Sequence, residues 1–201
     1  METSKTLAVD TLARVLMPKK GEPHDVRMLY LIEQEHNKQR LRWSDRTSFE
    51  IPAGNEVSFE TYFNAFPASY WRRWSQLDSV VLAMEVEGRA TISVYRSKHD
   101  GTRISVTNVE ATGYTEIPLK LGNFEDGGWL WFDVTAEDDT RVVNAAWCAP
   151  QEPKEQVLDD GTVVPPQPKQ VAVGIPTFNR PRDAVNALHA LAEDPYVEAS
   201  I

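Results

Sequence analysis

The chain has little cysteine and little positive charge. Cys148 is its one cysteine among 201 residues, so no internal disulfide can form and a reducing compartment is expected. Its 21 lysines and arginines are outnumbered by 30 aspartates and glutamates, which gives a formal net charge of -9 at pH 7. Such an acidic chain does not neutralise phosphates on a large scale, so we expect no nucleic-acid partner.

Long apolar runs are also missing. No stretch of about 18 apolar residues is present, which excludes a transmembrane helix. The N-terminal segment METSKTLAVDTLARVLMPKK has no basic leader followed by an apolar run, so no secretory signal is expected. A composition of 41% hydrophobic and 25% charged residues is typical of an ordinary globular protein. The sequence therefore predicts a soluble cytoplasmic protein.

Residues 1–150 show the short alternating patterns of an all-β domain. Apolar residues alternate over Leu82–Val86 and again over Ala90–Val94, and Gly88-Arg89 between them predicts a hairpin turn. Asp100-Gly101 predicts the next turn. Turn signals spaced by about eight to twelve residues, with no long helical stripe, predict a mainly β domain that is an antiparallel β-sandwich or jelly roll.

Other strands are predicted on both sides of this pattern. Parallel pairing is not expected, because crossover helices are absent from the pattern. The additional predicted strands are Val26–Leu31, Thr47–Ile51, Val57–Phe66, Trp129–Val134 and Arg141–Cys148.

The chain changes character at residues 151–169, where four prolines lie among charged and polar residues. Proline cannot donate a hydrogen bond to a β ladder and restricts the residue before it. We interpret this segment as a linker between two domains, and a long loop within one domain is the alternative.

Residues 170–201 predict one strand, one turn and one helix. A short apolar strand is expected over Val171–Ile175. Pro181 suits the first turn of the helix that follows, and Asp194-Pro195 ends it. A parallel strand needs cover on both faces, so we expect this unit to open an α/β domain that is truncated here.

The turn between this strand and helix has the residues of a phosphate or nucleotide corner. Thr177, Phe178 and Arg180 lie beyond the carboxyl end of the strand, where open α/β sheets bind ligands. The free N–H groups of the helix favour anions, and Arg180 can grip a phosphate or stack on a base. The alternative is that Asn179 caps the helix and Arg180 is a solvated surface residue.

These segments resemble a known glycosyltransferase family. Ile175–Pro181 and the helix after it resemble the opening of a family 2 type glycosyltransferase of GT-A fold. Phe59–Trp74, with its all-β surroundings, resembles the N-terminal region of the actinobacterial galactofuranosyltransferase 2 family, which polymerises cell-wall galactan. The resemblance implies that the uridine diphosphate of UDP-galactofuranose is bound with the help of Pro176, Thr177, Phe178 and Arg180.

The resemblance also implies a domain order and a set of partners. A β-sandwich at 1–150 and a linker at 151–169 would precede the start of a truncated GT-A domain at 170–201. The divalent metal (Mg²⁺ or Mn²⁺) and the catalytic base of the whole enzyme would be held by residues outside this chain, so the fragment is expected to be inactive. The implied partners are a lipid-linked galactan acceptor, the inner face of the plasma membrane and further copies of the chain.

Aromatic residues form a second candidate site. Rings can stack on the apolar faces of sugars, and core or interdomain packing is the alternative. Neighbouring arginines can pair with carboxylates of another domain, with a membrane surface or with a lipid-linked acceptor. The residues are Tyr62, Phe66, Tyr70, Trp71, Arg72, Arg73, Trp74, Trp129 and Trp131.

Other polar groups are expected to have structural roles. Cys148 lies in an apolar run and is expected to be a buried thiol rather than a nucleophile. Asp138-Asp139 and Asp159-Asp160 are expected in solvated turns. No metal-ligand spacing is found among the histidines His24, His36, His99 and His189.

Two functions from different classes stay open at this point. The first is the N-terminal part of a galactofuranosyltransferase, whose β domain orients the acceptor or supports assembly. The alternative is a stand-alone carbohydrate-binding or protein-interaction β-sandwich module. Further strand–helix units encoded downstream would favour the enzyme.

Overall fold

The computed structural model divides the chain into two compact units, Met1–Glu152 and Pro153–Ile201. The residues that the structure describes are 8–43, 45–75, 77–122, 128–150, 156–157, 163–164 and 179–193.

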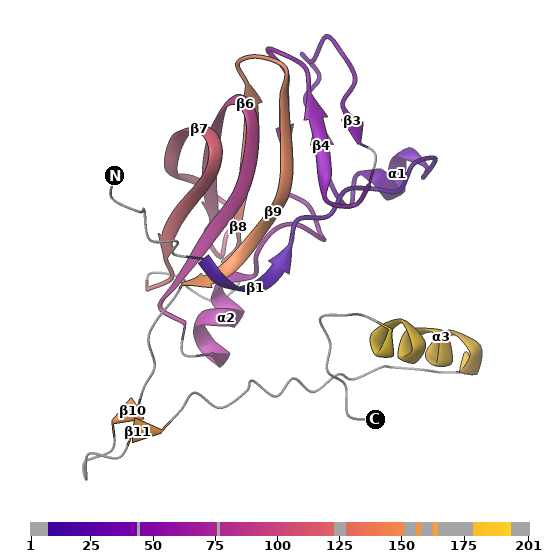
Figure 1. Ribbon diagram of the computed structural model, residues 1–201, viewed down its shortest axis with the longest axis vertical. Helices are drawn as coiled ribbons and strands as arrows, with labels where there is room; N and C mark the ends of the chain where they lie inside the picture. The colour runs from indigo at the N-terminus through magenta and orange to yellow at the C-terminus, as the bar shows by residue number, and fades with distance from the viewer. Residues whose placement is uncertain are drawn as a thin grey trace. The chain divides into compact units, whose positions relative to one another are not determined.

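The first unit is mainly β (Figure 1). Two short helices, α1 (His24–Arg27) and α2 (Ala68–Trp74), lie between its strands. The strands are β1 (Ala8–Arg14), β2 (Ile32–Glu33), β3 (Arg42–Trp43), β4 (Ser48–Ile51), β5 (Glu56–Ser58), β6 (Ser79–Ser97), β7 (Arg103–Lys120), β8 (Leu130–Ala136) and β9 (Thr140–Pro150).

The nine strands form one curled sheet in the order β2-β5-β8-β6-β9-β4-β3, with β1 beside β9 and β7 beside β6. All pairings described within this sheet are antiparallel, which confirms that part of the prediction. The predicted strands in the Thr47–Ile51, Trp129–Val134 and Arg141–Cys148 regions are confirmed as β4, β8 and β9. The predicted turn at Asp100-Gly101 is confirmed as the turn between β6 and β7, where Gly101 has a φ of 81°.

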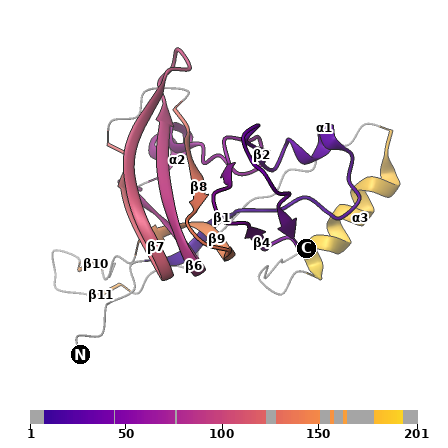
Figure 2. The same cartoon turned by 90° about the horizontal axis from the view of Figure 1, so that it is seen from above.

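A bend at Gly88 divides β6 between two partners. One edge of β6 pairs with β7 along its length, while the other edge pairs first with β9 and then, beyond Gly88, with β8. Gly88 has a φ of 108°, and Gly113 on the facing part of β7 has a φ of 66°. Bulges of this kind bend a strand and let it pass from one half of a folded sheet to the other. Figure 2 shows the curved β6–β7 hairpin from above.

The predicted hairpin turn at Gly88-Arg89 is therefore wrong. The glycine does break the alternation, but β6 continues through it as a single strand of 19 residues. The turn between β8 and β9 packs against this bulge, where the Arg89 backbone N–H donates to Asp138 Oδ1 at 2.8 Å. Asp138 and Asp139 thus lie in a turn, as predicted, and the Asp139 carboxylate accepts from the Ala53 N–H at 3.0 Å.

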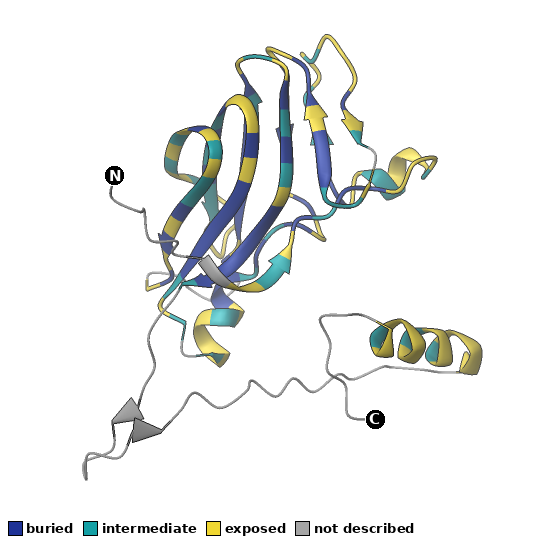
Figure 3. Cartoon of the chain, viewed as in Figure 1, coloured by how far each residue is buried: buried dark blue, intermediate teal, exposed yellow. Residues whose placement is uncertain are grey.

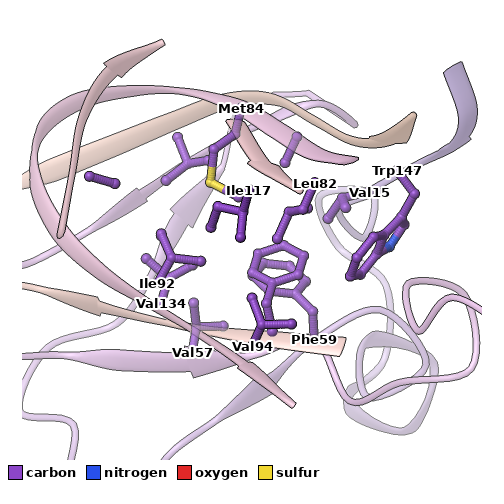
Figure 4. Packing of buried hydrophobic residues seen from close by; sticks show 14 of the residues in the cluster. Val15, Val57, Phe59, Leu82, Met84, Ile92, Val94, Ile117, Val134 and Trp147 are labelled. Carbon is purple, nitrogen blue, oxygen red and sulfur yellow. The ribbon is translucent and has the colours of Figure 1, made fainter. Parts of the chain in front are cut away.

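Both halves of the sheet contribute to the main hydrophobic core (Figures 3 and 4). Aromatic rings link them: Phe59 stacks on Phe132 with ring centroids 4.6 Å apart, and Trp147 lies 5.9 Å from Phe132. Burying each large side chain of this kind contributes roughly 1.5–3 kcal/mol. The apolar residues of β8 that face this core are Leu130, Phe132, Val134 and Ala136.

In the connecting segments, one predicted strand is wrong and another is confirmed only at its start. Val26–Leu31 is not a strand: its first residues belong to α1, which has Pro23 as its N-cap, and the chain then turns so that Tyr30 and Leu31 become buried. Within Val57–Phe66, strand structure ends at Ser58. After Ser58 the chain is irregular. Thr61 and Asn64 are buried there, and their side chains donate hydrogen bonds to the Tyr30 carbonyl.

Helix α2 was not predicted from the sequence. Its seven residues are too few to display a helical period clearly. Trp71 anchors α2 to the first unit: its ring stacks on that of Phe66, with the two centroids 5.7 Å apart. Tertiary packing therefore supplies the stability that a helix of this length lacks in isolation.

The second unit contains β10 (Gln156–Val157), β11 (Val163–Val164) and α3 (Pro181–Ala192). Strands β10 and β11 pair with each other inside the segment predicted as a linker. Helix α3 confirms the predicted helix, with Pro181 in its first turn. The predicted strand Val171–Ile175 and most of the linker lie outside the described residues, so the linker and the GT-A unit stay predictions. Within the part of the chain that the structure describes, no helix is long and apolar enough to cross a membrane.

The bend gives a direct test of the fold. A Cβ at Gly88 would lie 2.8 Å from Asp138 Oδ1 and 3.0 Å from the Asp139 carbonyl oxygen. We expect Gly88→Ala to lower the free energy of unfolding by roughly 3 kcal/mol, because steric overlap adds to the cost of a positive φ. The measurement is urea unfolding followed by tryptophan fluorescence.

Gly101→Ala is the matched control. Gly101 also has a positive φ, of 81°, but nothing lies within 4 Å of a Cβ placed there. The control should lose only about 1 kcal/mol. Equal losses for the two variants would contradict the proposed close contact between the bulge and the β8–β9 turn.

Candidate functional site

Arg180 is the one residue of the predicted nucleotide corner that the structure describes. Pro176, Thr177 and Phe178 lie outside the described residues. Arg180 immediately precedes α3, its side chain is 78% exposed, and its Nη1 lies 3.9 Å from Asp183 Oδ2. Exposure at a helix N-terminus suits an anion-binding role and a solvated surface role equally. The assignment of these four residues therefore stays a prediction.

The alternative role of Asn179 as the helix cap is wrong. Arg180 occupies the N-cap position, and no side-chain hydrogen bond caps the first turn. Asn179 has a φ of 54°, so it turns the chain before the helix begins.

The predicted aromatic set separates into buried and exposed members. Phe66 and Trp131 are buried, and Trp71 is half-buried against Phe66, so these three rings have packing roles. Four others present their rings at the surface. These are Tyr62, Tyr70, Trp74 and Trp129, which are 78%, 58%, 77% and 37% exposed.

Cys148 is buried, as predicted, at 6% exposure. Burial raises the pKa of its thiol, which lowers the thiolate fraction at neutral pH. In the described ranges no group of three or more His, Cys, Asp or Glu side chains is placed to hold a metal ion. The burial and the raised pKa of Cys148 therefore disfavour it as a nucleophile.

A polar and aromatic cluster lies on the outward side of β8, opposite the core. We call it the Arg103 cluster, and it consists of Glu60, Tyr95, Arg103, Trp131 and Asp133. The Arg103 guanidinium donates to Asp133 Oδ2, and its carbon lies 3.5 Å from the Tyr95 ring centroid and 5.7 Å from that of Trp131. Arg103 Nη1 also lies 3.7 Å from Glu60 Oε2.

The electrostatics of the Arg103 cluster are unusual for a sheet surface. Asp133 is 2% exposed although it carries a carboxylate, and its charge is paired by Arg103. Burial raises the pKa of the Glu60 carboxyl; Arg103 works against this shift, and Asp133 adds to it. A buried ion pair is costly to break, because the partner left behind has lost its solvation.

Sequence reasoning missed most of this cluster. Trp131 was singled out for its ring, but Tyr95, Arg103 and Asp133 were not. The sequence does show an aspartate between two apolar residues, Phe132 and Val134. Alternation places that aspartate on the outward face of the strand, but it does not show that the side chain is buried there.

A separate polar hollow of about 380 Å³ lies beside the bulge. Arg42, Glu50, Glu87 and Arg141 line it. Arg141 Nη1 lies 3.3 Å from Glu87 Oε2, and both side chains are about half exposed. Such solvated pairs contribute little energy and give weak support for a binding site.

Comparison with known proteins gives a family match. The family model described as "Galactofuranosyltransferase 2 N-terminal" matches residues 12–150. The chain is 49% identical over 207 residues to "Galactofuranosyltransferase GlfT2" of Mycolicibacterium smegmatis, covering 100% of this chain and 30% of that protein. It is 46% identical over 201 residues to the protein of the same name from Mycobacterium tuberculosis, covering 97% and 30%. The chain thus spans about 30% of the length of these curated relatives.

Similar solved structures include carbohydrate-binding modules. A mutant of the family 29 module CBM29-2 in complex with mannohexaose has a TM-score of 0.38 and 12% identity, covering 68% of this chain and 89% of that one. TmCBM61 in complex with β-1,4-galactotriose has a TM-score of 0.32 and 13% identity, covering 59% and 86%. Similarities with such low sequence identity and TM-scores give no information about function.

The ion pair of the Arg103 cluster can be tested with one single and one double variant. Arg103→Ala should lower the free energy of unfolding by roughly 2–3 kcal/mol, because it leaves the buried Asp133 carboxylate unpaired. The double variant Arg103→Ala/Asp133→Asn should recover about 1 kcal/mol or more, because the unpaired charge is gone. Urea unfolding measures both. A double variant no more stable than Arg103→Ala would contradict the assignment of the cost to a buried charge.

Proposed function

The chain belongs to the galactofuranosyltransferase 2 N-terminal family, and on this basis we propose that it is the N-terminal part of a UDP-galactofuranose-dependent enzyme that polymerises cell-wall galactan. The observation behind the proposal is the 49% identity to a protein named galactofuranosyltransferase, which extends over the whole chain. The β unit and the segment that contains α3 both fall within that alignment.

In this proposal the β unit orients the galactan acceptor or supports assembly, and chemistry occurs elsewhere in a longer protein. The outward face of β8 supports an acceptor role, because it brings rings and hydrogen-bonding groups together. The proposed partners are a lipid-linked galactan acceptor, further copies of the protein and the inner face of the plasma membrane.

The donor corner is proposed at Pro176, Thr177, Phe178 and Arg180. An exposed guanidinium before the first turn of a 12-residue helix adds a charged donor pair to the free backbone N–H groups. Together these groups suit a diphosphate. The divalent metal and the base that activates the acceptor hydroxyl are proposed to be held by other parts of the longer protein, and no step through them follows from the described residues.

The reaction itself is tested with the longer protein. Incubated with UDP-galactofuranose and a synthetic galactofuranose disaccharide, it should extend the disaccharide, as measured by mass spectrometry. UDP-galactopyranose is the control donor and should not support extension. A protein that binds the disaccharide but transfers nothing from UDP-galactofuranose would contradict the enzyme assignment and favour a carbohydrate-binding module.

The donor corner is tested separately by Arg180→Ala in the longer protein. Loss of a charge-assisted contact to the diphosphate should raise the KM for UDP-galactofuranose by about tenfold or more. Arg182→Ala is the matched control, because Arg182 is an exposed arginine two residues further along α3. Unchanged donor kinetics in Arg180→Ala, or an equal change in both variants, would remove Arg180 from the site.

A further inference from the structure

Two side chains on the outward face of β8 are buried, although side chains on that face are expected to be exposed. Successive residues of a strand point to opposite faces, and Phe132 points into the core. Trp131 and Asp133 therefore point outward, yet each is only 2% exposed. The side chain that the contacts place against both of them is Arg103, from the first residue of β7.

The Arg103 guanidinium lies over this spot, against the rings of Tyr95 and Trp131. It lies 3.5 Å from the Tyr95 ring centroid, which is stacking distance, and the side chain as a whole is 40% exposed. Glu60 Oε2 lies 3.7 Å from Arg103 Nη1, and the Glu60 side chain is 49% exposed. The arginine thus has two carboxylate partners, one buried and one at the surface.

Among the described residues, two buried polar atoms beside Arg103 have no hydrogen-bond partner. They are the Trp131 Nε1–H, which is a donor, and Asp133 Oδ1, which is an acceptor. Each such atom costs stability, and native proteins usually satisfy it. A ligand hydroxyl can donate to a carboxylate oxygen and accept from an indole N–H. The two atoms therefore match the chemistry of a polyol.

The surrounding face favours a neutral ligand. On neighbouring strands, the residues directly opposite one another share a face of the sheet. Asp133 is opposite Ser93, which is opposite Asn108, while Thr91 is opposite Glu110. Hydroxyl, amide and carboxylate groups thus continue the face on which the Arg103 cluster lies. The excess of carboxylates disfavours a phosphate or other anion, and the polar side chains disfavour an apolar peptide.

We propose that Tyr95, Trp131 and Asp133 form a subsite for one sugar ring, with the guanidinium of Arg103 standing in the free protein where the ring binds. On binding, Arg103 turns to Glu60, which keeps the guanidinium paired, and hydroxyl groups of the ligand replace its hydrogen bond to the Asp133 carboxylate. The apolar face of the ring stacks on Tyr95. Hydroxyl groups of the same ring donate to Asp133 and accept from Trp131. The assignment of the ring to galactofuranose rests on the proposed function.

The subsite is tested by titrating the ¹⁵N-labelled 201-residue chain with a synthetic galactofuranose tetrasaccharide. The indole N–H signal of Trp131, identified by its loss in Trp131→Phe, should shift and saturate. The indole N–H of Trp147 already donates to the Asn64 carbonyl at 3.0 Å inside the core, so its signal should stay unchanged. It also reports whether each variant keeps its fold.

Variants separate a binding role from a structural one. Tyr95→Ala should weaken tetrasaccharide binding about tenfold or more, whereas Tyr95→Phe, which keeps the ring, should bind within about twofold of the original chain. Asp133→Asn should also weaken binding, because hydrogen bonds to a charged acceptor are the stronger ones. Tyr114→Ala, at an exposed tyrosine on the other part of β7, is the matched control and should leave binding unchanged.

The outcomes distinguish the subsite from the proposed function. A tetrasaccharide that leaves the Trp131 signal in place, or that binds Tyr95→Ala as tightly as Tyr95→Phe, overturns the subsite even if the longer protein transfers galactofuranose. A saturating Trp131 shift that Tyr95→Ala and Asp133→Asn weaken supports the subsite even if transfer is absent. In that case the enzyme assignment fails and the sugar site stands.

Discussion

The fold of the first unit depends on the bend of β6 at Gly88. On the edge of β6 away from β7, neither β8 nor β9 spans all 19 residues of the strand; the part before the bend pairs with β9 and the part after it pairs with β8. The positive φ of Gly88 and the close approach of the β8–β9 turn leave no room for a side chain there. Because β7 bends at Gly113 as well, the whole hairpin passes from one half of the sheet to the other around one core.

The same bend places the Arg103 cluster. Beyond Gly88, β6 lies between β7 and β8, so that Tyr95 comes beside Trp131 and the start of β7 comes within reach of both. Arg103 can then stack on Tyr95 and pair with Asp133 at the same time. The ion pair stabilises the arrangement, while the unpartnered atoms of Trp131 and Asp133 leave it incompletely satisfied. A surface that is not fully hydrogen-bonded is suited to a ligand that supplies the missing groups.

The sequence was most informative where one local rule decided the structure. Alternation predicted strand structure over what is now β6, Asp100-Gly101 predicted the turn that follows it, and Pro181 marked the start of α3. The prediction at Gly88 was wrong because a glycine with positive φ is equally compatible with a hairpin turn and with a bulge. Only the pairing of β6 with β8 and β9 distinguishes the two. The site was harder to predict. Asp133 and Arg103 are 30 residues apart, and the burial that makes their pair significant arises only when β7 and β8 flank β6.

The central claim is that the outward face of β8 receives a sugar ring in the place that Arg103 occupies. A crystal structure of the chain with a galactofuranose oligosaccharide tests it most directly. We expect a furanose ring over Tyr95, with a hydroxyl hydrogen-bonded to Asp133 Oδ1 and the guanidinium of Arg103 moved to Glu60. A sugar bound at another surface, with Arg103 still stacked on Tyr95, would contradict the claim.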